Sequence, residues 1–343
     1  MTHADALRAP GSGPADAHRA SGSSPTRVAL ALGSGSARGY AHIGVINELR
    51  DRGYEIVGIA GSSMGALVGG LHAAGRLDDF ADWARALTQR AMLRLLDPSI
   101  TAAGVLRAEK ILDAVREILG PVAIEELSIP YTAVATDLIA GKSVWLQRGP
   151  VDEAIRASIA IPGVIAPHVV DGRLLADGGI LDPLPMAPIA AVNADLTIAV
   201  SLSGNETEAE RETESRPAAE WLNRMVRNTS ALFERPAARA VLSRFGAATP
   251  DAAAETEEVE EIPEEPKLGG RFEVMNRTID IAQAALARHT LAAYPPDLLI
   301  EVPRSACRSL EFHRAAEVID IGRALASRTL DTLEVDPPAD VDD

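Results

Sequence analysis

The chain is poor in cysteine and in aromatic residues. Of its 343 residues one is cysteine, Cys307, and only 3% are aromatic. A single thiol excludes an intramolecular disulfide bond and a zinc site built from several cysteines. With so few aromatic rings, the core has to be assembled from Ala, Val, Leu and Ile, and a hydrophobic content of 47% provides ample material for it.

Long apolar runs are also missing. No stretch reaches the roughly 18 consecutive apolar residues that indicate a transmembrane helix. Residues 1–26 contain acids as well as bases and no continuous apolar segment, which argues against a signal peptide and indicates a disordered leader. We therefore expect a cytoplasmic protein, and the sequence leaves open a peripheral contact with the membrane.

Negative charge exceeds positive charge, but unevenly. The net charge is −16, and residues 251–265 hold eight acids and residues 331–343 six, with no base in either segment. The remainder is nearly neutral and shows no basic stripe, so a nucleic-acid partner is not expected. We predict a folded domain over 27–330, with a flexible acidic loop at 247–270 and an acidic tail at 331–343. No residue cluster has the spacing of metal ligands, so neither a metal nor another cofactor is expected.

Short apolar runs alternate with helical patterns along the domain. This alternation predicts an α/β fold with a mostly parallel central sheet and helices on both faces. In such a fold the ligand site lies beyond the carboxyl ends of the strands. The expected strands are 28–32, 56–60, 131–136, 143–147, 173–176, 196–201 and 298–302. The expected helices are 40–51, 77–95, 107–119, 151–158, 217–245, 271–291 and 310–330.

The most informative motif is GSSMG at residues 61–65. It follows the apolar run 54–60 and precedes a segment that reads as the opening of a helix. A serine on a sharp turn between strand and helix has an exposed hydroxyl group, and Gly61 and Gly65 give the backbone the freedom to make that turn. We identify Ser63 as the candidate nucleophile.

Two further segments supply the other parts of an acyl-transfer site. The loop 33–39 (GSGSARG) leads into a helix, where backbone N–H groups favour an oxyanion or a phosphate. The apolar run 174–176 is followed by Asp177, a candidate base, and then by Gly178 and Gly179. We assign the oxyanion to the backbone amides around Gly33, Ser34 and Gly35. The wider oxyanion and substrate-binding set also includes Ser36, Arg38, Gly39 and Met64.

These segments, with the motif ASIAIPGV at 157–164, resemble the patatin-like phospholipases. A late segment at 310–317 resembles the closing helix of the short bacterial branch, which is related to the neuropathy target esterase catalytic domain. The resemblance covers residues 27–330 and implies a three-layer fold and a Ser–Asp dyad without histidine. It implies a serine-dependent lipid acyl hydrolase that acts on phospholipids or lysophospholipids. Ser34 and Ser36 interrupt the run of glycines that is common in the family, so the choice of oxyanion amide stays open.

Several alternatives remain at this stage. His289 and His313 follow Ser63 and Asp177 in the chain order of a Ser–Asp–His triad, but neither has the setting of a catalytic base. Arg38 either is solvated or, as we favour, pairs with a substrate phosphate or an internal carboxylate. Apolar residues between 92 and 106 line an acyl channel or belong to the core, and 161–167 are a candidate pocket wall.

Two other functions compete with hydrolysis. A dinucleotide- or phosphate-binding module would use the loop 33–39, but the last glycine of that loop comes one residue too late for the G-x-G-x-x-G fingerprint. A catalytically silent regulatory protein could keep the fold, although the presence of both Ser63 and Asp177 argues against it.

Overall fold

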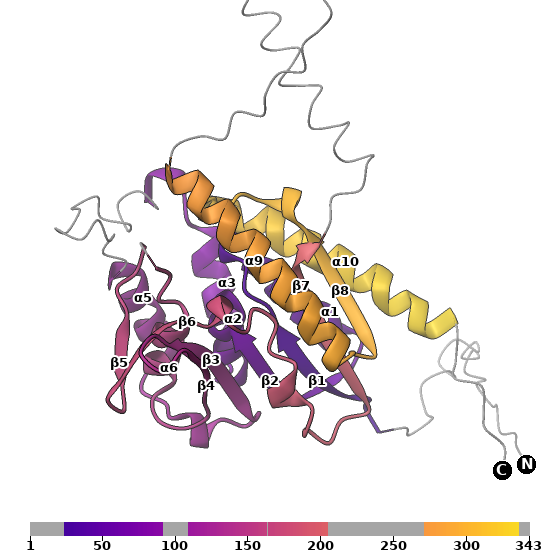
Figure 1. The fold of residues 1–343 in the computed structure, drawn as a ribbon. Coiled ribbons are helices and arrows are strands. Elements are labelled where there is room, and N and C mark those ends of the chain that lie inside the picture. The colour runs from indigo at the N-terminus through magenta and orange to yellow at the C-terminus, as the bar shows by residue number, and fades with distance from the viewer. Residues whose placement is uncertain (1–23, 92–108, 163, 205–270, 336–343) are drawn as a thin grey trace, which may run out of the picture.

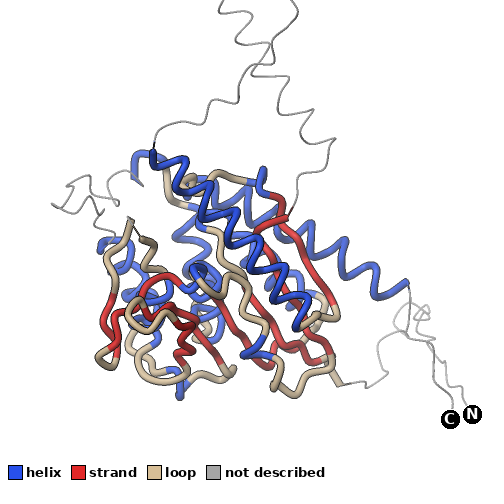
Figure 2. The backbone as a smooth tube through the Cα atoms, viewed as in Figure 1, coloured by secondary structure: helices blue, strands red, loops and turns tan. Residues whose placement is uncertain are grey.

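The computed structural model describes residues 24–91, 109–162, 164–204 and 271–335, which form an eight-stranded sheet between helices (Figures 1 and 2). The strand order is β5-β6-β3-β2-β1-β7-β8, and β4 also pairs with β3. The strands are β1 (Arg27–Leu32), β2 (Glu55–Ser62), β3 (Tyr131–Asp137), β4 (Lys142–Leu146), β5 (His168–Val170), β6 (Arg173–Asp177), β7 (Leu196–Gly204) and β8 (Leu298–Pro303).

The centre of the sheet is parallel and one end is antiparallel. β3, β2, β1, β7 and β8 pair in parallel, whereas β4 and β6 are antiparallel to β3 and β5 is antiparallel to β6. The predicted fold class is therefore confirmed. The principal helices are α1 (Ala41–Asp51), α2 (Met64–Ala73), α3 (Leu77–Arg85), α5 (Glu109–Leu119), α6 (Val151–Ser158), α9 (Arg271–Ala293) and α10 (Ala315–Val335).

The sequence of β1 explains why the sheet has two covered faces. Successive side chains of a strand point to opposite faces, and β1 alternates large and small apolar residues. Val28, Leu30 and Leu32 belong to the main core with α1 and α10, whereas Ala29 and Ala31 belong to a smaller core under α9. Figure 1 shows α9 lying across this second face. The molecule thus has three layers.

The last helix is an integral part of this architecture. α10 crosses α1 so closely that a Cβ at Gly44 would lie 2.0 Å from the carbonyl oxygen of Ile319. Reciprocally, a Cβ at Gly322 would lie 2.1 Å from the carbonyl oxygen of Ala41. Only glycine allows two helix backbones to approach in this way.

Some boundaries differ from those expected. The helix predicted over 77–95 ends at Arg85, and the Thr88 hydroxyl accepts a hydrogen bond from the Ala91 N–H and caps a new helical turn. The predicted acidic tail begins too early, because α10 runs to Val335 and Asp331 forms an ion pair with Arg52.

One other predicted helix begins later than expected. The helix expected from 310 starts at Ala315, after a 3-10 turn over Phe312–Arg314. The leader, the helix 217–245, the acidic loop and the apolar residues 92–106 lie outside the described residues.

Candidate active site

Ser63 lies on the turn between β2 and α2 with a backbone conformation that is rare for residues other than glycine. Its φ is 55° and its ψ is −121°, and the residue is only 1% exposed. A non-glycine residue in such a region costs on the order of 1–3 kcal/mol and persists only where its surroundings enforce it. The strain is therefore concentrated on the candidate nucleophile itself.

The two glycines of the motif serve a different purpose from the one expected. Neither Gly61 nor Gly65 has a positive φ. A Cβ at Gly61 would lie 2.3 Å from the backbone of Gly65, and a Cβ at Gly65 would lie 2.0 Å from the carbonyl oxygen of Leu32. The glycines thus permit β2, α2 and the end of β1 to touch, which brings the serine next to the glycine-rich loop.

Asp177, the last residue of β6, is the direct partner of the serine. Its Oδ2 accepts a hydrogen bond of 2.5 Å from the Ser63 hydroxyl, and its Oδ1 accepts one of 2.8 Å from the Gly179 N–H. The residue is 3% exposed, and this burial raises the pKa of its carboxyl group to about 6, against the lowering effect of the two hydrogen bonds. The carboxylate is therefore a stronger base than an exposed aspartate.

The sheet itself brings these two residues together. Residues 133 and 134 of β3 pair with both β2 and β4, and residues 135–137 pair with both β4 and β6. β2 and β6 must therefore share one edge of β3, and they run toward each other along it. β2 ends with Ser62 opposite Val134, and β6 ends with Asp177 opposite Ala135. Ser63 and Asp177 face each other where the two strands meet.

Ser158, at the end of α6, holds the turn in place. Its hydroxyl accepts a hydrogen bond of 2.9 Å from the Ser63 N–H and donates one of 2.6 Å to the Val134 carbonyl oxygen. Ser158 is completely buried. The motif at 157–164 contains Ser158 but predicts no role for it; the only signal is a serine at the end of a predicted helix, before an apolar turn.

The glycine-rich loop has fewer free amides than expected. The Gly33 N–H donates to the Val200 carbonyl oxygen at 3.0 Å, and the Ser34 N–H donates to that of Pro183 at 2.7 Å. This finding corrects the expectation that these two amides face the substrate. Within the described residues the N–H groups of Gly35 and Ser36 have no hydrogen-bond acceptor. The N–H of Met64, in the first turn of α2, is likewise free of an intrahelical partner.

Two further contacts fix this loop. The Nε2–H of His42 donates to the Gly33 carbonyl oxygen at 2.8 Å, and burial lowers the pKa of His42 to about 4, so the ring is neutral. A Cβ at Gly39 would lie 2.3 Å from the Cβ of Met64, so the loop and the serine turn are in direct contact. The sequence predicts no role for His42.

Arg38 pairs with an internal carboxylate. Its Nη2 donates to Oδ1 of Asp280 at 3.1 Å, and its side chain is 6% exposed. Of the two partners proposed from the sequence, the structure therefore shows the carboxylate. Because Asp280 belongs to α9, the ion pair ties the loop to the helix that covers the second face of the sheet.

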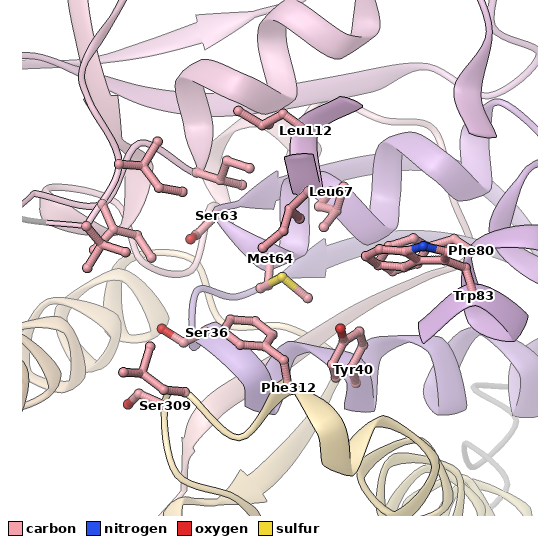
Figure 3. Close-up of a pocket in the computed structure, with 16 residues that line it drawn as sticks. Ser36, Tyr40, Ser63, Met64, Leu67, Phe80, Trp83, Leu112, Ser309 and Phe312 are labelled. Atoms are coloured by element: carbon pink, nitrogen blue, oxygen red, sulfur yellow. The ribbon is translucent and has the colours of Figure 1, made fainter. Parts of the chain in front are cut away.

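An apolar cavity opens beside Ser63 (Figure 3). In the figure Ser36 and Ser309 lie on the same side of it as Ser63, and Met64 lies near its middle. Ile161 contributes part of the wall, as expected for 161–167. The other lining residues are Tyr40, Leu67, Phe80, Trp83, Ile111, Leu112, Ile159, Val164, Ile165, Leu310 and Phe312.

Histidine is not among the hydrogen-bond partners of the two central side chains. In the described part of the chain, neither His289 nor His313 bonds to Ser63 or Asp177. His168 is engaged elsewhere, with Arg156 and Glu153.

Within the described residues no group of three His, Cys, Asp or Glu side chains could hold a metal ion. Among the described helices, none has the length and apolarity needed to cross a bilayer.

A serine on a tight turn between strand and helix, bonded to a buried acid at the edge of a largely parallel sheet, is typical of α/β proteins that act as serine hydrolases. Residues 30–190 match a family model described as patatin-like phospholipase. An NTE family protein of Mycobacterium tuberculosis is 71% identical over 327 residues, which cover 88% of this chain and 91% of that protein. The chain belongs to the NTE family of patatin-like phospholipases, and this membership indicates lipid hydrolase activity.

More distant relatives share only part of their length with this chain. Neuropathy target esterase sws of Drosophila melanogaster is 29% identical over 179 residues, which are 50% of this chain and 12% of that protein. Among solved structures, VipD from Legionella pneumophila aligns over 90% of this chain and 67% of its own, with 14% identity and a TM-score of 0.42.

Proposed function

We propose that the protein is a serine-dependent lipid acyl hydrolase that cleaves carboxylic esters of phospholipids or lysophospholipids through a Ser–Asp dyad. The proposal is carried by the hydrogen bond of 2.5 Å between Ser63 and Asp177, in a strained turn that opens onto an apolar cavity. The Ser63 hydroxyl group acts as the nucleophile and the Asp177 carboxylate as the base, and the apolar cavity accommodates an acyl chain.

In the acylation step, the Oγ of Ser63 attacks the ester carbonyl carbon while its proton passes to Oδ2 of Asp177. The tetrahedral intermediate collapses when the bond to the leaving alcohol breaks, and Asp177 returns the proton to the alcohol oxygen. The acyl group is then bound to Ser63 as an ester. In the deacylation step, water gives a proton to Asp177 and attacks this ester, and the proton then returns to Ser63.

The negative charge of the tetrahedral intermediate needs hydrogen-bond donors. The amides of Gly35, Ser36 and Met64 are the candidates, because those of Gly33 and Ser34 are already bonded. Donors aimed at the oxyanion are each worth about 3–4 kcal/mol of transition-state stabilisation. His42 would contribute indirectly, since its bond to the Gly33 carbonyl fixes the loop.

A fluorophosphonate probe tests the assignment of the nucleophile. The wild-type protein is expected to be labelled and to hydrolyse a short-chain aryl ester, and Ser63→Ala is expected to lose both properties while remaining folded. Ser62→Ala is the matched control, because the adjacent hydroxyl is bonded to the Asp182 carbonyl oxygen at 2.5 Å rather than to the dyad. Wild-type protein that is neither labelled nor active would support a catalytically silent family member instead.

A further inference from the structure

A third of the few aromatic residues of this chain line a single cavity. The sequence contains three Trp, four Tyr and five Phe, and four of these residues line the cavity beside Ser63: Tyr40, Phe80, Trp83 and Phe312. The four rings form a continuous series in space, each in contact with the next. Ring centroids are 6.1 Å apart for Phe312 and Tyr40, 6.2 Å for Tyr40 and Phe80, and 5.6 Å for Phe80 and Trp83.

The stacked pair of rings lies away from the dyad. In Figure 3, Phe80 and Trp83 occupy the side of the cavity opposite Ser63, with Met64 and Tyr40 between them. Both rings come from α3. Phe80 is 1% exposed and belongs to the core, whereas Trp83 is only half-buried. An acyl chain that entered from Ser63 would therefore reach these two rings last.

Trp83 also contributes to a second hollow, separate from the cavity beside Ser63. This hollow lies at the surface between α3 and α5, where the neighbours of Trp83 are Arg76, Asp79 and Glu117. The same indole ring thus lines the inner cavity and the outer hollow, which accounts for its intermediate exposure. Among the residues that the structure describes, no other lines both of these spaces.

From this geometry we infer that Trp83 is the partition that closes the distal end of the cavity and limits the length of the acyl chain it accepts. The inference rests on the proposed function. A chain that fits the cavity gains free energy with each buried methylene, up to the indole ring, where further methylenes meet a rigid wall. Removal of the ring joins the cavity to the surface hollow and gives longer chains a path outward.

Acyl-length selectivity tests the inference directly. We would measure kcat/KM for a series of p-nitrophenyl esters from acetate to palmitate, with wild type, Trp83→Ala and Trp83→Phe. For Trp83→Ala the optimum is expected to move to longer chains, with kcat/KM rising about four-fold for each methylene newly accommodated. The change is expected to be larger for chains long enough to reach the ring than for the acetate and butyrate esters, and Trp83→Phe is expected to give a smaller shift.

Two variants serve as controls. Trp145→Ala removes a tryptophan that is 46% exposed on β4, and its length profile is expected to match that of the wild type. Trp83→Leu retains apolar packing on α3 if Trp83→Ala does not fold, and it is expected to show the same direction of change. A uniform fall in kcat/KM at all lengths, in folded protein, would overturn the inference and leave Trp83 a purely structural role.

A binding measurement separates this inference from the proposed function. In the background Trp145→Phe, Trp221→Phe, Trp83 is the remaining tryptophan. A fatty acid brominated at its terminal methyl end is expected to quench its fluorescence more strongly than one brominated beside the carboxyl group. Equal quenching by the two acids would contradict the placement of Trp83, even in a protein that hydrolyses esters. Absence of hydrolysis with unequal quenching would reject only the proposed function.

Discussion

Replacement of Asp177 by asparagine is expected to abolish activity and, at neutral pH, to stabilise the fold. The carboxyl group is buried, and burial raises its pKa from 3.8 to about 6. A raised pKa means that the folded protein binds the proton more tightly than the unfolded chain does. Keeping this group ionised at pH 7, as a general base requires, therefore works against folding.

The size of the effect follows from the shift in pKa. At roughly 1.4 kcal/mol per unit, a rise from 3.8 to about 6 corresponds to a cost of about 3 kcal/mol once the group is ionised. Below pH 3.8 the group is protonated in both states and costs nothing. As the pH rises from 3.8 to about 6 the cost of ionising the buried group develops, and above about pH 6 the full cost persists.

Asparagine avoids this cost because it is neutral at every pH. Its side-chain oxygen can still accept the hydrogen bond from Gly179, so the local geometry is retained. We expect Asp177→Asn to be more stable than the wild type by about 1–3 kcal/mol above pH 6, and we expect the difference to shrink toward pH 4. Urea unfolding curves of both proteins at several pH values measure this difference.

The activity of the same two proteins completes the test. In the wild type, kcat/KM for a short-chain aryl ester is expected to rise with pH through about 6, because the base must be ionised. In Asp177→Asn the rate is expected to fall by a factor of about 10²–10⁴. An Asp177→Asn protein that is less stable than the wild type at pH 8, or a kcat/KM that does not change between pH 5 and 8, would refute the reasoning.

Three further predictions concern the surroundings of the dyad. His289→Ala, His313→Ala and their combination should retain most of the activity, because neither ring bonds to the dyad; a folded variant as inactive as Asp177→Asn would instead indicate a triad. Ser158→Ala should lower kcat about 10–100-fold with little change in KM, since it removes the partner of the Ser63 N–H; a change confined to KM would contradict this. Excess EDTA should leave hydrolysis of the aryl ester unchanged, and inhibition that calcium reverses would show a metal requirement.

The sequence predicted those parts of the site that depend on short motifs. Ser63 was recognisable because glycines, a preceding apolar run and a following helix all lie within a few residues. Seven of the eight strands were also expected. β5 was missed because it spans only three residues, His168–Val170, which are too few to show an alternating pattern.

Features that depend on contacts between distant segments could not be read in this way. The Ser63–Asp177 bond joins residues 114 positions apart, and it depends on which edge of β3 each strand occupies. Which loop amides are free depends on carbonyl groups of Val200 and Pro183. The four aromatic rings that line the cavity come from α3, from the turn before α10 and from Tyr40, which directly follows the glycine-rich loop, and no single segment shows them together.

The sequence Asp177-Gly178-Gly179 also helps to fix the register in which β6 pairs with β3. β6 pairs with β3 through only three residues, and a slip of one position would turn the carboxylate to the opposite face. One slip would place Asp177 where Gly178 lies, at which a Cβ would be 2.1 Å from the Val134 carbonyl oxygen. The opposite slip would place Ile180 where Gly179 lies, at which a Cβ would be 2.5 Å from the Ser34 hydroxyl oxygen. Each of these two slips thus brings a side chain into close contact with its surroundings, and both are disfavoured relative to the register that presents Asp177 to Ser63.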